Sequence, residues 1–229
     1  MAGHTLDGSV VAVVGASGAL GSLVARELAD RGARLVLVGR DPDRLSAVGI
    51  DGASSVVADL TDATAGDRIV QTARDDYGRL DGVVNAAGVV AFGPLVDTED
   101  AVVEELFMTN VIGPLWMIRR VAPALGETGG FFCNISAVVA EQPLPGMVPY
   151  AAAKAALTSA DAALVRELRR MRVSVIDARP PHTETGLADR PLAGTAPKLP
   201  PGLDPQVVAR RVVEAIEAGE SEVDSSRFA

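Results

Sequence analysis

A tyrosine and a lysine four residues apart carry the clearest chemical signal in this chain. They are Tyr150 and Lys154, within a stretch whose apolar residues recur at helical spacing. On a helix, side chains at this separation share one face, about 5–6 Å apart at Cβ. An ammonium beside a phenol favours the phenolate and lowers the phenol pKa from about 10. The pair predicts a general acid/base at Tyr150, although most such pairs are only solvated surface pairs.

A glycine-rich segment near the start of the chain predicts a site for a pair of phosphate groups. Residues 10–14 are apolar and mostly β-branched, which is typical of a buried strand. The strand leads into Gly15-Ala16-Ser17-Gly18-Ala19-Leu20-Gly21, and an amphipathic helix follows and ends at Gly32. Glycines let the backbone come close to a ligand, and a helix N-terminus offers unpaired N–H groups. The alternative is a Gly/Ala-rich turn without a ligand.

The elements that must position these motifs follow from the alternation of strand-like and helical patterns. This alternation indicates strand–helix–strand units with right-handed crossovers, hence an α/β fold with a doubly wound parallel sheet in three layers. The expected strands are residues 10–14, 35–38, 56–58, 82–85, 131–135 and 173–178, with a stub at 222–223. Five further helices are expected. One begins at Asp41-Pro42, one spans about 65–77, and one spans about 97–125 with Asp97 or Thr98 as its cap. Another includes Tyr150, and the last runs from Asp204 to Glu217.

Length and composition fit a single domain. The chain has 229 residues, 48% hydrophobic and only 3% aromatic, so valine, alanine and leucine must fill the core, as in a parallel sheet covered on both faces. No repeat, charge block or linker divides residues 1–229. Residues 180–205 are rich in Pro and Gly, and a substrate-covering loop and a plain surface connection fit them equally. Residues 221–229 are expected to form a frayed tail.

Net charge and targeting signals limit the classes of partner and the compartment that we expect for this chain. The formal net charge of −9 argues against nucleic acid or an anionic membrane as a partner. The first residues lack the pattern of a signal peptide, and we expect no apolar stretch of membrane-spanning length, so a cytoplasmic protein is the default. The single cysteine, Cys133, lies in an apolar run and is expected in the core, without a disulfide framework. No metal site is expected.

The order and spacing of these motifs resemble the short-chain dehydrogenase/reductase family over nearly the whole chain. The resemblance implies a Rossmann fold that binds a nicotinamide dinucleotide. The opening turn is similar to the family's Gly-x-x-x-Gly-x-Gly motif, with Gly15 and Gly21 at the outer positions and Ala19 in the middle. The cofactor-binding residues that the resemblance implies are Gly15, Ser17, Gly18, Ala19, Leu20, Gly21, Arg40, Asp59, Leu60, Asn85, Ala87, Gly88, Tyr150, Lys154, Pro180, Thr183 and Thr185.

Three later segments carry the same resemblance. Asp59-Leu60 is similar to the family's adenine-contacting Asp, and Asn85-Ala86-Ala87-Gly88 is similar to its Asn-Asn-Ala-Gly segment. Residues 180–185 resemble the segment that faces the nicotinamide carboxamide, with Pro181 in place of a glycine. Asn110, in the long helix, matches the family's catalytic Asn, which holds a proton-relay water beside the lysine.

One position departs from the family's catalytic set. Counting back thirteen residues from Tyr150, where the family has its catalytic Ser, gives Ala137, with Ser136 one residue away. Strand geometry would point the two to opposite faces. A shifted loop would deliver Ser136 as a catalytic residue. Otherwise another donor, such as His182 or water, orients the carbonyl, and Ser136 is a strand-end hydroxyl bonded to backbone.

The end of the second strand bears on cofactor choice. Family members that prefer NAD carry an Asp there, whereas this chain has Gly39 followed by Arg40. A guanidinium can hold a 2′-phosphate, with Ser17 as a second donor, which favours NADP(H) over NAD(H). The alternative is a surface ion pair between Arg40 and Asp41 or Asp43.

The resemblance implies an NADP(H)-dependent oxidoreductase acting on a small-molecule carbonyl or secondary alcohol. In it Tyr150 moves the proton, Lys154 lowers the phenol pKa and binds the nicotinamide ribose, and Asn110 supports the proton path. The alternative is a non-catalytic NADP(H)-binding protein, because Ala137 replaces the catalytic Ser. The resemblance also implies a homodimer or homotetramer. The apolar residues of the long helix that exceed one buried face are Leu115, Trp116, Ile118 and Val121.

Overall fold

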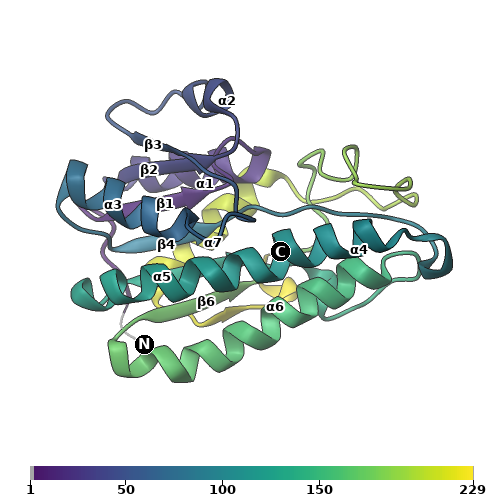
Figure 1. Ribbon diagram of the computed structural model, residues 1–229. Coiled ribbons are helices and arrows are strands. Elements are labelled where there is room, and N and C mark those ends of the chain that lie inside the picture. The colour runs from purple at the N-terminus through teal and green to yellow at the C-terminus, as the bar shows by residue number, and fades with distance from the viewer. Residues whose placement is uncertain (1–2, 229) are drawn as a thin grey trace.

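Seven strands form one fully parallel sheet in the computed structural model, which describes residues 3–228 (Figure 1). Their order is β3-β2-β1-β4-β5-β6-β7, so the direction of winding reverses between β1 and β4, where doubly wound sheets bind ligands. The predicted fold class is confirmed. The strands are β1 Val10–Val14, β2 Arg34–Gly39, β3 Ser54–Val57, β4 Gly82–Asn85, β5 Phe131–Ile135, β6 Ser174–Ala178 and β7 Glu222–Val223.

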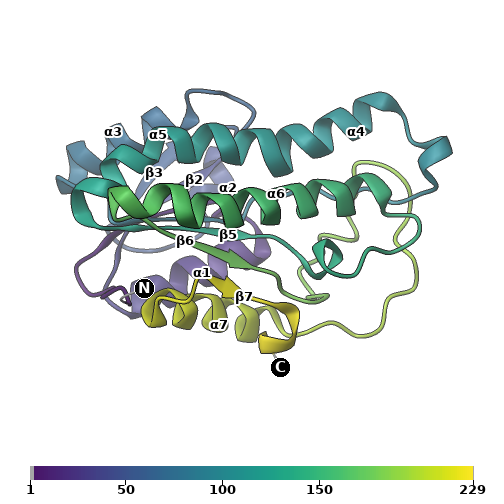
Figure 2. The same cartoon turned by 90° about the horizontal axis from the view of Figure 1, so that it is seen from below.

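Helices cover both faces of the sheet. Figure 2 shows α1 and α7 on one side and α3, α5 and α6 on the other, the expected three layers. Asp41 caps α2 as predicted, because its Oδ1 accepts a hydrogen bond from the backbone N–H of Arg44 at 3.0 Å. The helices are α1 Ala19–Asp30, α2 Pro42–Ser46, α3 Ala65–Tyr77, α4 Asp100–Phe107, α5 Gly113–Thr128, α6 Val148–Glu167 and α7 Pro205–Ala218.

The core consists of aliphatic residues on both sides of the sheet. All five residues of β1 are buried, since one set of side chains packs against α1 and α7 and the other against α3 and α5. This two-sided burial explains why the strand is a continuous apolar run instead of an alternating one. Phe131 and Phe132, the aromatic pair of β5, point into the two opposite layers. Cys133, the next residue of β5, is buried as expected.

The long helix differs from its prediction in two ways. Residues 95–97 form a separate 3₁₀ turn, and α4 begins at Asp100 with no side-chain cap, so the predicted cap at Asp97 or Thr98 is wrong. A π-helical turn, Met108–Ile112, then joins α4 to α5 without a break, as the continuous ribbon in Figure 1 shows. Periodicity alone does not distinguish a π turn from an α turn, so the sequence could not reveal it.

The run Asp100–Thr128 is long and apolar enough to cross a membrane by length and composition alone. The expectation that no stretch reaches that length is therefore wrong. In the fold this run contributes Met117, Val121 and Leu125 to the core against the sheet, where each is almost completely buried. Such burial is the behaviour of a core helix, whose apolar residues face protein and not lipid.

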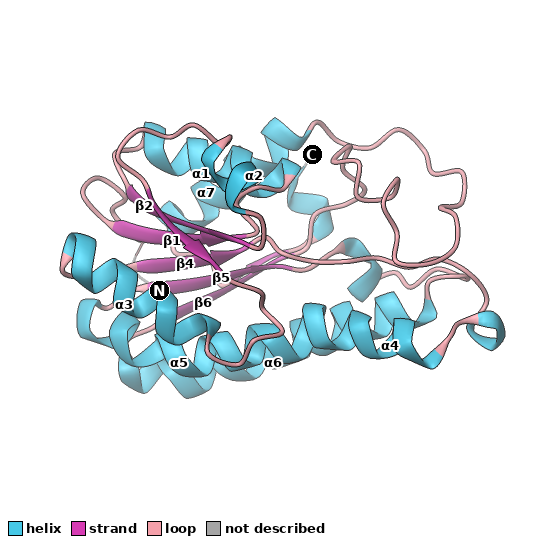
Figure 3. Cartoon of the chain, turned by 45° about the horizontal axis from the view of Figure 1, so that its top comes forward, coloured by secondary structure: helices cyan, strands magenta, loops and turns pink. Residues whose placement is uncertain are grey.

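The C-terminal segment is ordered by the sheet. The stub strand expected at 222–223 is present as β7 and pairs with β6. A 3₁₀ turn, Ser225–Phe228, follows and buries Phe228 in the core beside α7, so the expectation of a frayed tail is wrong for the residues described. Figure 3 shows that long loops gather at one end of the sheet, where the parallel strands end.

Candidate active site

The glycine-rich turn after β1 is shaped by close backbone contacts. Gly15 has φ +77°, and a Cβ there would lie 2.8 Å from the backbone N of Ala87. A Cβ on Gly21 would lie 2.2 Å from the Gly15 carbonyl oxygen. Ala19 is tolerated at the middle position because it is exposed as the first residue of α1. No side chain caps this helix, so its first N–H groups are directed to the space beyond the turn.

Two arginines lie at the far end of this turn. Arg40 Nη1 is 3.6 Å from Asp59 Oδ2, and the surface pair expected with Asp41 or Asp43 is not the contact that forms. Arg44, which the sequence interpretation missed, donates from Nη2 to the Ser17 carbonyl oxygen at 2.9 Å. Its signal was present in the sequence, because the Asp41 cap places it on the first turn of α2 beside Arg40.

Glycine at position 39 leaves the space between these groups open. A Cβ on Gly39 would meet Ser17 Oγ at 3.2 Å and Leu45 Cδ2 at 3.1 Å. Burial raises the pKa of Asp59, but hydrogen bonds from Thr61 and the charge of Arg40 outweigh it and hold the pKa below its usual value. This end of the site therefore combines two guanidinium groups, one hydroxyl and one ionised carboxylate.

Asn110 fixes the loop after β4. Its Nδ2 donates to the Val89 carbonyl oxygen at 2.9 Å, and its Oδ1 accepts from the Val89 N–H at 3.1 Å. Both ends of the amide are thus used by one backbone unit. A Cβ on Gly88 would lie 3.0 Å from Asn110 Oδ1 and 3.5 Å from Lys154 Nζ, so the structure brings these three residues together. The π turn presents Asn110 at this point.

Tyr150 and Lys154 lie on the buried face of α6, 6% and 4% exposed. Lys154 Nζ donates to the Ile135 carbonyl oxygen at 3.0 Å. Burial lowers the pKa of Lys154 to about 8 against the opposing effects of Asp177 and Asp161. Burial also raises the pKa of Tyr150 to about 12. The expectation that Lys154 lowers the phenol pKa is therefore wrong for the protein alone, because desolvation dominates.

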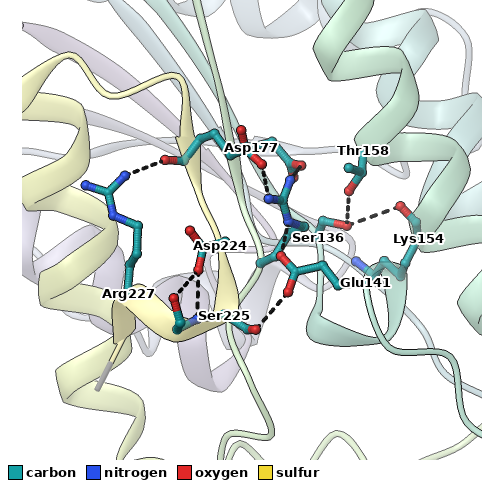
Figure 4. A network of polar contacts seen from close by, with 11 residues as sticks. Ser136, Glu141, Lys154, Thr158, Asp177, Asp224, Ser225 and Arg227 are labelled. Carbon is teal, nitrogen blue, oxygen red and sulfur yellow. Dashed lines mark hydrogen bonds and ion pairs between the residues drawn. The ribbon is translucent and has the colours of Figure 1, made fainter.

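The hydroxyl of Ser136 is bonded to groups of α6 that come after Tyr150 in the helix. It donates to the Lys154 carbonyl oxygen at 3.2 Å and lies 3.1 Å from Thr158 Oγ1, on the α6 side of the strand end (Figure 4). Ala137 follows in extended backbone. Both line the cavity described next, but the hydroxyl of Ser136 is already bonded within the protein. This placement favours the strand-end interpretation of Ser136.

A cavity of about 540 Å³ joins these groups along the carboxyl ends of the strands. It extends from the α1 N-terminus and Arg40 to Tyr150 and Lys154. Asn85 and Asn110 are not among its lining residues. The other residues that the resemblance implied all line it: Gly15, Ser17, Gly18, Ala19, Leu20, Gly21, Arg40, Asp59, Leu60, Ala87, Gly88, Ser136, Tyr150, Lys154, Pro180, Thr183 and Thr185.

Beyond Tyr150 the cavity wall is apolar. Tyr150 belongs to a cluster with Phe92, Val139 and Met147, separate from the two core layers. The clearest exception is His182, which lines the cavity with its Nε2 3.6 Å from Glu184 Oε1. Further lining residues at this end are Val90, Val138, Leu144, Leu187, Ala188, Arg190 and Leu199.

The segment 180–205 packs on this apolar end. The Leu192 N–H donates to the Val90 carbonyl oxygen at 2.8 Å, and the Phe92 N–H donates to the Ala193 carbonyl oxygen at 2.9 Å. The Val138 N–H donates to the Pro180 carbonyl oxygen at 3.0 Å. These contacts tie the segment to the loops after β4 and β5 and favour a covering loop over a plain surface connection.

Comparisons with known proteins agree with this geometry. The sequence profile of the family described as short chain dehydrogenase matches residues 9–193. An uncharacterized oxidoreductase of Staphylococcus saprophyticus is 29% identical over 221 residues, and the match covers 93% of this chain and 92% of that protein. An uncharacterized oxidoreductase of Methylorubrum extorquens is 34% identical over 181 residues, and the match covers 75% of this chain and 72% of that protein.

Solved structures give the same result. A short chain dehydrogenase from Burkholderia cenocepacia in complex with NADP superposes with a TM-score of 0.85 at 28% identity, over 97% of this chain and 90% of that one. A 3-ketoacyl-(acyl-carrier-protein) reductase from Brucella melitensis complexed with NADH shares the fold, with a TM-score of 0.85 at 24% identity over 98% of this chain and 100% of that one. The match over most of the chain, with the strand order and the cavity, leads to one conclusion: this protein belongs to the short-chain dehydrogenase family.

Proposed function

We propose that this protein is an NADP(H)-dependent oxidoreductase that transfers a hydride between nicotinamide and a carbonyl compound or secondary alcohol. The observation that carries the proposal is one continuous cavity with an uncapped helix N-terminus at one end and the buried Tyr150 and Lys154 at the other. A dinucleotide needs the first end, and reduction of a carbonyl needs a proton donor at the second.

The residues of the nucleotide end fit such a cofactor. A side chain at Gly15 or Gly21 would collide with backbone, and the uncapped N–H groups of α1 suit a pyrophosphate. Lys154, which lines the cavity with Gly88 and has Asn110 close by, fits the nicotinamide ribose end. When bound, the nicotinamide ring supplies or accepts the hydride.

Tyr150 serves as the proton donor in the reducing direction. Because burial raises its pKa to about 12, the phenol is neutral at pH 7 and its Oη carries the proton that a developing alkoxide takes up. Oxidation requires the phenolate, so we expect it to need more alkaline conditions. The Lys154 ammonium, present below about pH 8, adds positive charge beside the reacting oxygen.

The nucleotide end favours NADP(H) over NAD(H). Arg40 and Arg44 supply two guanidinium groups, Ser17 supplies a hydroxyl, and Gly39 brings no carboxylate to repel a 2′-phosphate. The NADP held by the Burkholderia cenocepacia relative agrees with this choice.

A non-catalytic NADP(H)-binding protein is the second candidate. One observation favours it. The hydroxyl of Ser136 is hydrogen-bonded to α6, and Ala137 has a methyl group instead of a hydrogen-bond donor at the cavity wall. The intact Tyr150, Lys154 and Asn110 favour the enzyme. His182, held beside Glu184, is a donor that a catalytic site would use in place of the missing hydroxyl.

We extend the proposal to organisation and assembly. Residues 1–229 form one dinucleotide-binding domain with 180–205 as its substrate-side loop, and the protein works in the cytoplasm as a homodimer or homotetramer. Ile118 and Val121 are core residues, which leaves Leu115 and Trp116 of the predicted apolar set for an interface. Light scattering at micromolar concentration tests the assembly, and a monomer alone would contradict it.

The test of the function has two parts. Calorimetric titration with NADPH and NADH measures cofactor binding and preference. A screen of ketones, aldehydes and secondary alcohols, followed at 340 nm, measures turnover with Tyr150→Phe as the blank. Turnover that the blank abolishes supports the enzyme. NADPH binding without any such turnover supports the non-catalytic candidate.

A further inference from the structure

The proposed reaction depends on a charged lysine that receives little direct support. The one hydrogen bond described for Lys154 Nζ is to the Ile135 carbonyl oxygen, a neutral group. A neutral acceptor does not replace the water that a buried ammonium has lost. Two buried carboxyl groups, Asp177 on β6 and Asp161 on α6 itself, are the charges that act in favour of the ammonium.

Asp161 lies on the same face of α6 as Lys154, seven residues or about two turns further along. It is completely buried. Its Oδ1 accepts from Asn134 Nδ2 at 2.7 Å, and within residues 3–228 its Oδ2 has no hydrogen-bond partner. Asn134 is neutral, and the cation that acts on Asp161 is Lys154.

Asp177, on β6, has a cation of its own. Its Oδ2 accepts from Arg179 Nη1 at 2.6 Å, and the same guanidinium contacts Glu141 and Glu222, in the network of Figure 4. An arginine stays charged at any working pH, so Arg179 offsets part of the charge of Asp177, yet Asp177 still acts on Lys154 more strongly than Asp161 does. No arginine among residues 3–228 forms an ion pair with Asp161, so its protonation state depends on burial and on the charges of Asp177 and Lys154.

The two carboxyl groups also depend on each other. Asp177 raises the pKa of Asp161 by repulsion, and Asp177 Oδ1, like Asp161 Oδ2, has no partner in the part of the chain that the structure describes. Burial raises the pKa of each carboxyl, so both favour the protonated form more than an exposed carboxyl does.

We propose that Asp161 is a positioning residue for the active site, which holds a proton at neutral pH and, on releasing it to solvent in alkaline solution, adds to the negative charge of Asp177 that keeps Lys154 as an ammonium. The proposal rests on the proposed function only in giving Lys154 a catalytic task. Its electrostatic content concerns the protein alone.

The pH ranges of the two groups coincide. Burial, with Asp177, raises the pKa of Asp161 to about 8, the value to which burial lowers that of Lys154. Asp161 therefore becomes negatively charged in the same pH range in which Lys154 would otherwise lose its proton. The groups that face Asp161 are Lys154 on its own helix, Asn134 and the neutral thiol of Cys133 on β5, and Asp177 with Arg179 on β6.

A series of hydrogen bonds connects Asp161 to the loop after β4. The Ala87 N–H donates to Asn85 Oδ1 at 3.3 Å, Asn85 Nδ2 donates to Asn134 Oδ1 at 2.9 Å, and Asn134 donates to Asp161. This series explains the place of Asn85, which lies outside the cavity wall. It ends at Asp161 as its acceptor, so this carboxyl is held in one orientation behind the site.

The composition of the chain makes a direct test possible. It contains only two lysines, Lys154 and Lys198. Protein labelled with ¹³C at lysine Cε is titrated by NMR from pH 5 to 11 without cofactor or substrate, and Lys198→Arg assigns the signals. We expect a Lys154 midpoint near 8. In Asp161→Asn we expect it to fall by roughly one pH unit.

A matched control is Asp81→Asn, which alters a buried carboxyl paired with Arg79 just before β4, at the amino ends of the strands. The Lys154 midpoint should not move in this variant. Asp161→Asn keeps an oxygen for Asn134 and so preserves the fold. An unchanged Lys154 midpoint in Asp161→Asn, or an equal shift in Asp81→Asn, would overturn the proposal.

The unmodified protein gives a second measurement that needs no variant. With ¹³C at aspartate Cγ, Asp161 should titrate in the range of Lys154 and far above its usual pKa. A midpoint near 4 would overturn the proposal even if Asp161→Asn failed to fold. Since neither titration involves turnover, a failed substrate screen would leave both results interpretable.

Discussion

The two ends of the cavity are built in opposite ways. At the nucleotide end the side chains of Arg40 and Asp59 are 68% and 39% exposed, and their ion pair is 3.6 Å long. At the catalytic end Tyr150 and Lys154 are almost fully buried, and burial shifts the pKa of each. Exposed charges act weakly and are screened by salt, whereas buried charges depend on every neighbour. We therefore expect substitutions at the nucleotide end to change cofactor affinity moderately. Substitutions at the catalytic end should change turnover strongly and in a pH-dependent way.

Removal of the Tyr150 hydroxyl should have the largest effect. Tyr150→Phe takes away the proposed proton donor without opening a cavity, so turnover should fall by about 10²–10⁴-fold while NADPH affinity is kept. Steady-state kinetics and calorimetry measure the two quantities. Tyr77→Phe is the control, because that hydroxyl bonds Leu35 and Gly52 backbone away from the site and its loss should leave turnover unchanged.

Restoring a donor at position 137 should act in the opposite direction. Ala137→Ser places a hydroxyl where the wall now has a methyl group, and a donor aimed at a developing oxyanion is worth about 10²–10³ in rate. The measurement is kcat on any substrate found in the screen. A gain would mean that the natural protein works without a full donor set.

Ser136→Ala sharpens that experiment. Since this hydroxyl bonds Lys154 and Thr158 on α6, its removal should lower the unfolding free energy by about 1 kcal/mol and change kcat little. Loss of activity in Ser136→Ala, with no gain in Ala137→Ser, would show instead that Ser136 has taken the catalytic role.

At the exposed end the expected effects are moderate. Arg40→Ala and Arg44→Ala should each weaken NADPH binding by about 1.5–3 kcal/mol and NADH binding far less, because only the former has a 2′-phosphate. The difference should shrink as salt is raised. Equal affinities of the unmodified protein for NADPH and NADH would contradict the proposed preference.

The smallest effect concerns stability. Asp161 has a pKa raised to about 8 in the fold, so its stabilising contribution is complete below about pH 4 and is lost as the pH rises through 8. Asp161→Asn should therefore melt like the unmodified protein near pH 4 and at a higher temperature at pH 9, where each kcal/mol of difference is worth roughly 2–4 °C. Circular dichroism melts at several pH values measure this. A difference in Tm that does not vary with pH would contradict the assignment.

The same contrast between exposed and buried regions explains what the sequence could predict. The positions of most strands and helices follow from local periodicity and turn residues, and β4 and β5 begin and end where expected. The glycine-rich turn could be predicted equally well, because each of its glycines lies where a Cβ would come too close to nearby backbone atoms. Such features depend on residues close together in the chain.

The buried features depend on residues far apart and were missed for that reason. Nothing near Asp161 in sequence shows that it would meet Asn134 and Asp177 from two strands. The raised pKa of Tyr150 likewise follows from how tightly the loops after β4 and β5 close around it. Spacing predicted the face of the helix but not the loss of water there.

The π turn at Asn110 makes chain length part of the active site. A π turn holds one residue more than the α turn it replaces, so deleting any one residue of Met108–Ile112 would allow a regular helix to form. The tighter turn would take up the missing residue, so the faces of α4 and α5 that pack in the core would stay in phase. The loss would fall on the turn itself, where Asn110 could no longer hold both backbone groups of Val89. A one-residue deletion in this turn should therefore remove the Asn110 contact while the rest of the helix stays packed.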